Sequence, residues 1–137
     1  MRTKIVATVL GGAFAAILSG TASADPAPTT RLELTIEHPG PEDAPPGESA
    51  APANRRTVVL SCSPAAGSHP RPDRACADLD ASEGRIETPP GDVACILLYD
   101  PVIATAHGTW QGRPVEFKRQ YGNDCEMHAK TRNIFKF

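Results

Sequence analysis

The sequence has 137 residues, and its 14 Lys and Arg against 16 Asp and Glu give a formal net charge of −2 at pH 7. This mild acidity argues against nucleic acid or anionic lipid as a partner, because both need basic patches on the protein. Aromatic residues make up only 5% of the chain, so any hydrophobic core is modest.

Residues 1–24 have the pattern of a secretory signal peptide. A positively charged start precedes an apolar run at 5–18, and Ala22-Ser23-Ala24 matches the small-x-small cleavage pattern. A membrane anchor is the alternative, but the run is shorter than the roughly 20 residues that a membrane span needs. We therefore expect a secreted protein whose residues 25–137 form one small domain.

Four cysteines lie in this domain, at positions 62, 76, 95 and 125. Four cysteines in a small secreted domain predict two disulfides, and their spacing leaves all three pairings open. A zinc site is the competing interpretation. It is disfavoured because the chain has no C-x-x-C pair.

The first half of the domain predicts two strands and a helix. After a polar tail at 25–30, residues 31–37 alternate between apolar and polar, as in a half-buried strand. Residues 38–56 are rich in proline and predict a connecting loop, because proline cannot donate to a central strand. The β-branched and apolar residues 57–62 predict a second strand. A short helix is expected over 71–80, where apolar residues recur at helical spacing.

Two further strands are expected at 101–110 and 113–121, joined by a turn at Gln111-Gly112. The chain should end with a helix over 123–130 and a final strand at 133–137. Asn123 and Asp124 are both plausible N-caps of that helix. Five strands and two short helices, with the strands close in sequence, predict an α+β fold built on an antiparallel sheet.

Motifs of catalysis are absent. No serine lies in G-x-S-x-G, and there is neither an H-E-x-x-H pair nor a glycine-rich phosphate loop. The four histidines are interpreted as scattered residues that are solvated or serve as caps. We therefore expect no enzyme, no metal and no cofactor, although a site assembled from distant residues would escape this test.

The stretch ACILLYDPV, residues 94–102, has two possible interpretations. Four large apolar residues in a row fit a buried strand, and periodicity alone does not exclude it. The flanks favour an exposed loop instead, because Pro89-Pro90-Gly91 precede the stretch and Asp100-Pro101 end it.

The sequence resembles the Streptomyces subtilisin inhibitor-like family of secreted protease inhibitors. The resemblance covers essentially the whole mature chain in family order. The matching motifs are LELTIEH at 32–38, VVLSCSP at 58–64, GSHPRPDRACADL at 67–79, CILLYDPV at 95–102, GTWQGRPVEF at 108–117, NDCEM at 123–127 and IFKF at 134–137.

This resemblance implies a fold and an assembly. The expected fold is a five-stranded antiparallel sheet with two helices on one face. The expected disulfides are Cys62–Cys76 and Cys95–Cys125, and the expected assembly is a homodimer formed through the sheets.

The resemblance also implies that residues 94–101 are the exposed reactive-site loop. Leu97 would be the primary specificity residue, and Leu97–Leu98 the bond presented for cleavage. The other residues expected to contact a protease are Ala94, Cys95, Ile96, Tyr99 and Asp100. Ile96 departs from the family, which commonly has proline there to restrict the backbone.

The predicted function is therefore tight-binding, slowly cleaved, substrate-like inhibition of subtilisin-like and chymotrypsin-like serine proteases. The alternative is a secreted structural or interaction protein of the same fold, for example a cross-linking substrate or an inhibitor of another class of protease.

Overall fold

A computed structural model of the protein describes residues 29–40 and 54–137. The predicted signal peptide at 1–24 lies outside the described residues. So do most of the expected polar tail at 25–30 and most of the proline-rich loop at 38–56.

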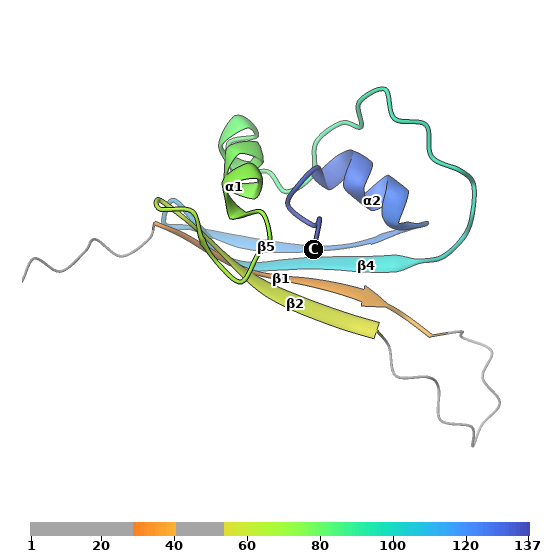
Figure 1. The fold of residues 1–137 in the computed structure, drawn as a ribbon, viewed down its shortest axis with the longest axis horizontal. Coiled ribbons are helices and arrows are strands. Elements are labelled where there is room, and N and C mark those ends of the chain that lie inside the picture. The colour runs from red at the N-terminus through yellow and green to blue at the C-terminus, as the bar shows by residue number, and fades with distance from the viewer. Residues whose placement is uncertain (1–28, 41–53) are drawn as a thin grey trace, which may run out of the picture.

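The described residues form one antiparallel sheet with two helices on the same face (Figure 1). The strand order is β3-β2-β1-β4-β5, and the predicted α+β fold is confirmed. The strands are β1 Thr30–His38, β2 Asn54–Cys62, β3 Ala66–Gly67, β4 Val102–Trp110 and β5 Arg113–Tyr121, and the helices are α1 Pro72–Ala81 and α2 Asp124–Thr131. Within the described ranges, neither helix is long and apolar enough to cross a membrane.

The core lies between the sheet and the helices, as the strand periodicity predicts. Leu32, Leu34 and Ile36 of β1 all point toward the helices and are buried. Helix α1 begins with proline at its first position, where the missing N–H costs no hydrogen bond. Its buried residues, Ala75, Cys76 and Leu79, occupy the face expected from helical spacing.

The hairpin of β4 and β5 determines where the exposed apolar stretch lies. Gln111 and Gly112 both have positive φ, at 47° and 75°, as the two-residue turn of a twisted hairpin requires. At the other end of the hairpin Val102 pairs with Tyr121. The residues just before β4 and just after β5 are therefore neighbours.

The expected strand at 133–137 is wrong, and the fifth strand is the two-residue β3. Ile134 and Phe135 are both buried, so the segment does not alternate between two faces. Its backbone forms local turns, with the Ile134 N–H donating to Thr131 O and the Lys136 N–H to Asn133 O. Burial in the core and hydrogen bonds from His69 and His128 to the carbonyls of Ile134 and Phe135, and not pairing at a sheet edge, hold these residues.

The position of Gly84, just after α1, requires glycine. Gly84 has φ +82°, and a side chain there would enter the ring of Trp110. The guanidinium of Arg113 lies 4.5 Å from the centre of the same ring. Trp110 therefore closes this end of the core between a glycine and a cation.

Candidate functional site

The apolar stretch between α1 and β4 is an exposed loop. Residues 93–101 have no helix or strand, and Leu97 is 100% exposed. Ile96, Leu98 and Tyr99 are 75%, 61% and 72% exposed. The buried-strand interpretation of this stretch is therefore wrong. Apolar side chains gathered in this way indicate a surface that binds a partner.

A disulfide fixes the start of the loop. Cys95 is bonded to Cys125 in the first turn of α2, with a distance of 5.7 Å between the two Cα atoms. The second disulfide joins Cys62 at the end of β2 to Cys76 in α1. These are the two pairs that the resemblance implies, and the part of the chain described contains no free cysteine.

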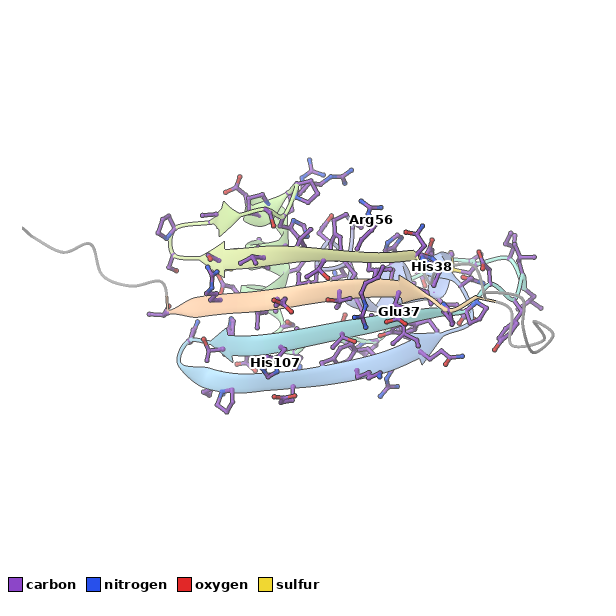
Figure 2. The ribbon with its side chains drawn as sticks, turned by 90° about the horizontal axis from the view of Figure 1, so that it is seen from below. Glu37, His38, Arg56 and His107 are labelled. Carbon is purple, nitrogen blue, oxygen red and sulfur yellow. A yellow bond between two sulfur atoms is a disulfide. The ribbon has the colours of Figure 1, made fainter. Side chains whose placement is uncertain are left out.

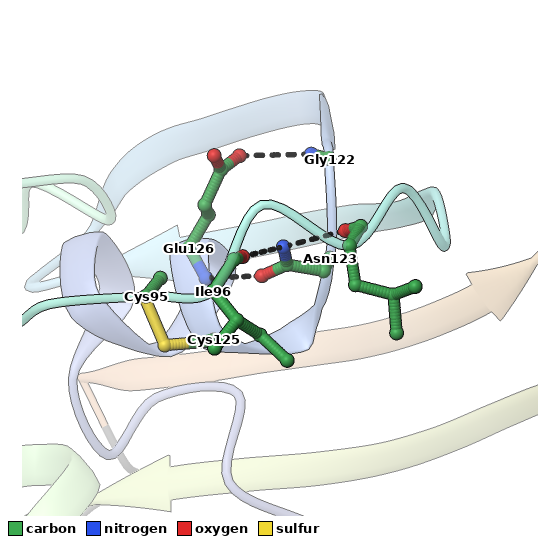
Figure 3. The surroundings of a disulfide bond; sticks show 7 residues. Cys95, Ile96, Gly122, Asn123, Cys125 and Glu126 are labelled. Carbon is green, nitrogen blue, oxygen red and sulfur yellow. Dashed lines mark hydrogen bonds between the residues drawn. A yellow bond between two sulfur atoms is a disulfide. The ribbon is translucent and has the colours of Figure 1, made fainter.

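A single buried amide holds the loop on both sides of Leu97. The Asn123 side-chain nitrogen donates to the carbonyl oxygen of Ile96 at 3.2 Å and to that of Leu98 at 2.9 Å (Figure 3). Its Oδ1 accepts from the Glu126 N–H at 3.0 Å, so Asn123 is also the N-cap of α2. The side chain thus uses both N–H groups and its oxygen.

Sequence reasoning predicted the capping role for Asn123 or Asp124 but missed the contacts of Asn123 with the loop. The bonded residues lie 25 and 27 positions away, so no local pattern reports them. The pairing of Val102 with Tyr121 and the Cys95–Cys125 disulfide bring the two segments together.

A third connection fixes the end of the loop. The Asp100 N–H donates to the carbonyl of Gly122 at 2.8 Å. The disulfide, the Asn123 amide and this bond all attach the loop to residues 122–125. Leu97 is therefore presented from a loop whose two ends are anchored to one short segment.

The predicted site residues divide by exposure. Six of the seven are exposed, while Cys95 is half-buried; the exposed residues are Ala94, Ile96, Leu97, Leu98, Tyr99 and Asp100.

Tyr121, just before the anchoring residues 122–125, is buried. Burial and the nearby Glu87 carboxylate raise the pKa of Tyr121 to about 12, so its phenol stays neutral at physiological pH.

None of the four histidines lies in this loop, and of the two interpretations offered for them solvation is wrong for His69. His69 is buried, not solvated: its Nδ1 accepts from the Arg71 N–H, and its Nε2 donates to Ile134 O at 3.1 Å. Burial lowers the pKa of His69, which keeps this ring neutral. Within residues 29–40 and 54–137, no three His, Cys, Asp or Glu side chains are placed to hold a metal ion.

Comparison with known proteins shows the family to which this chain is similar. The family model described as subtilisin inhibitor-like matches residues 28–123. Subtilisin inhibitor-like protein 5 of Streptomyces fradiae is 42% identical over 66% of this chain and 89% of its own length. A subtilase-type protease inhibitor of the same organism is 41% identical over 99% of this chain and 96% of its own.

A solved structure has the same fold. Sermetstatin of Streptomyces caespitosus, in complex with subtilisin of Bacillus licheniformis, superposes with a TM-score of 0.54 and 28% sequence identity. The match covers 79% of this chain and the whole of that chain.

Proposed function

This chain belongs to the subtilisin inhibitor-like family, a family of protease inhibitors and not of enzymes, and on this premise we propose that it inhibits subtilisin-like and chymotrypsin-like serine proteases. The observation that carries the proposal is the complete exposure of Leu97 on a loop anchored at both ends. Ile96, Leu98 and Tyr99 beside it are exposed as well, and proteins rarely leave a contiguous apolar patch in water unless a partner covers it.

The loop enters the protease cleft as a substrate does. Residues 94–97 pair as an extended strand with the edge of the cleft, and Leu97 fills the primary pocket. The bond presented to the catalytic serine is Leu97–Leu98, and residues 98–100 lie on the leaving-group side. Leucine suits the hydrophobic pocket of subtilisin-like and chymotrypsin-like enzymes. A trypsin-like pocket would keep a buried carboxylate without a partner, which costs affinity.

Anchoring makes the loop an inhibitor instead of a substrate. The loop is already ordered before binding, so little conformational entropy is lost in the complex. If Leu97–Leu98 is cut, the disulfide at Cys95 retains one new end. The bonds from Asn123 to Leu98 and from Gly122 to Asp100 retain the other. The new amine stays beside the acyl-enzyme, and the peptide bond re-forms.

The same contacts compensate for Ile96, which replaces the family's usual proline. Proline restricts φ and reduces loop freedom. Here the disulfide fixes the preceding residue, and the Asn123 amide holds the carbonyl of Ile96 itself.

Homodimerisation through the outer face of the sheet is part of the proposal. Both helices cover the opposite face, so the outer face is open in the described residues (Figure 2). Its side chains are mostly polar, with Glu37 paired to Arg55 and His107 to Glu116. Sedimentation at micromolar concentration tests this, and a monomer there would remove the dimer from the proposal.

Secretion is proposed from two features of the chain. Disulfides persist in oxidising compartments such as the extracellular space, and the structure has two. The sequence of residues 1–24 supplies a matching export signal. N-terminal sequencing of the exported protein should start near Asp25.

Titration against subtilisin, chymotrypsin and trypsin tests the function. We expect stoichiometric loss of subtilisin activity, weaker or equal inhibition of chymotrypsin, and little inhibition of trypsin. Leu97→Gly should abolish inhibition without unfolding the domain. Absence of inhibition at micromolar protein would instead favour a structural or interaction protein of the same fold.

A further inference from the structure

We propose that Glu126, whose hydrogen bonds go to Gly122 and Asn123 and not to the loop, is a positioning residue that keeps the loop in its inhibitory conformation. It acts through two neighbours, Asn123 and Gly122, each of which bonds the loop directly. This inference rests on the proposed inhibitory function.

The first connection runs through the backbone of Glu126. Its N–H donates to Oδ1 of Asn123 at 3.0 Å (Figure 3). Because an amide group is planar, fixing its oxygen also fixes the direction of its two N–H bonds. Those two bonds end at the carbonyls of Ile96 and Leu98, on either side of Leu97.

The second connection runs through the carboxylate. Oε2 of Glu126 accepts from the Gly122 N–H at 3.0 Å. The carbonyl of the same glycine accepts from the Asp100 N–H, which anchors the end of the loop. Glu126 thus closes a reciprocal pair at the start of α2, close to a capping box, and each half of the pair leads to the loop.

A purely structural role for Glu126 makes a different prediction. A carboxylate in the first turn of a helix stabilises it through the helix dipole, whatever its contacts. Asp124 is the matched control, because it lies in the same first turn but bonds only His38 among the described residues. If the dipole alone mattered, removing either carboxylate would have the same effect.

The test compares Glu126→Ala, Glu126→Gln and Asp124→Ala in the full mature protein. The rate at which subtilisin cuts Leu97–Leu98 in each variant is followed by mass spectrometry. We expect Glu126→Ala to be cut roughly tenfold faster than wild type, the effect of losing one hydrogen bond to a charged group. Gln can accept the same bond, so Glu126→Gln should restore slow cleavage, and Asp124→Ala should be cut at the wild-type rate.

A second variant keeps the test valid if Glu126→Ala unfolds. Gly122 does not have positive φ, so alanine fits its backbone, but the new methyl would lie 3.0 Å from Oε2 of Glu126. Gly122→Ala should therefore displace the carboxylate and speed cleavage. Combined with Glu126→Ala it should add little, because both changes break the same bond.

Amide exchange gives a readout that does not depend on inhibition. The Asp100 N–H should exchange faster in Glu126→Ala and at the wild-type rate in Asp124→Ala. Unchanged cleavage and unchanged Asp100 exchange, in a protein whose wild type inhibits subtilisin, would overturn the inference and leave the inhibitory function standing. A wild type that does not inhibit would overturn the proposed function and this inference with it.

Discussion

Replacing Asn123 separates loop bracing from helix capping. Asn123→Ser keeps an oxygen that can cap α2, but a serine cannot donate to the carbonyls of both Ile96 and Leu98. Those two bonds are 3.2 and 2.9 Å long, and neutral hydrogen bonds contribute about 0.5–1.5 kcal/mol each. The loss of about 1–3 kcal/mol should weaken inhibition of subtilisin roughly 5- to 150-fold, with little change in Tm.

Asn123→Ala removes the cap as well. It should weaken inhibition by a similar factor and also cost about 1 kcal/mol of stability, which is roughly 4–8 °C in Tm for a domain near this size. The inhibition constant is measured by titration of a fixed amount of subtilisin, and Tm by calorimetry. An unchanged inhibition constant in Asn123→Ser would refute the bracing role.

Three further predictions concern stability and the loop. Burial lowers the pKa of His69, so below about pH 6.5 the unfolded chain binds more protons at this residue than the folded protein does. The free energy of unfolding of the wild type should therefore fall between pH 7 and pH 5 by more than that of His69→Gln. Equal falls in denaturant titrations would contradict this. Changing both Cys95 and Cys125 to Ala should cost about 3–4 kcal/mol and turn the protein into a rapidly cut substrate; slow cleavage would show that the bridge is dispensable. Gly84→Ala should destabilise the protein by about 1–3 kcal/mol because the new methyl enters the indole ring of Trp110. Gly112→Ala is the control, because Gly112 also has positive φ, at +75°, but nothing lies within 4 Å of the new methyl. An equal loss of stability in both variants would show that backbone strain is the whole cause.

Local patterns in the sequence were sufficient to find the four long strands of the sheet. The alternation at 31–37 and the paired strands at 101–110 and 113–121 are visible because each strand buries one face and exposes the other. The strand predicted at 57–62 starts earlier, at Asn54, in the structure. The extra residues are exposed and polar, so hydrophobic periodicity does not report them.

The wrong strand at 133–137 also shows the limit of hydrophobic periodicity. Alternation around Phe135 and Phe137 suggested a strand, but tertiary contacts bury the adjacent Ile134 and Phe135 together. β3 was missed because two residues are too few to show any period.

The candidate site was only partly predictable. Proline, glycine and cysteine at its flanks indicate an exposed loop with a disulfide. The role of Asn123 depends on spatial contacts across 25 and 27 residues, which the hairpin register and the disulfide create and no local signal reveals.

The proposed function is tested most directly by exchanging Leu97, the exposed side chain proposed to enter the protease pocket. Leu97→Lys and wild type are titrated side by side against subtilisin, chymotrypsin and trypsin, with circular dichroism to confirm an unchanged fold. We expect Leu97→Lys to gain inhibition of trypsin and lose inhibition of chymotrypsin, because the lysine ammonium pairs with the carboxylate of a trypsin-like pocket. An identical inhibition profile for the two proteins would show that Leu97 does not enter the pocket and would contradict the assignment.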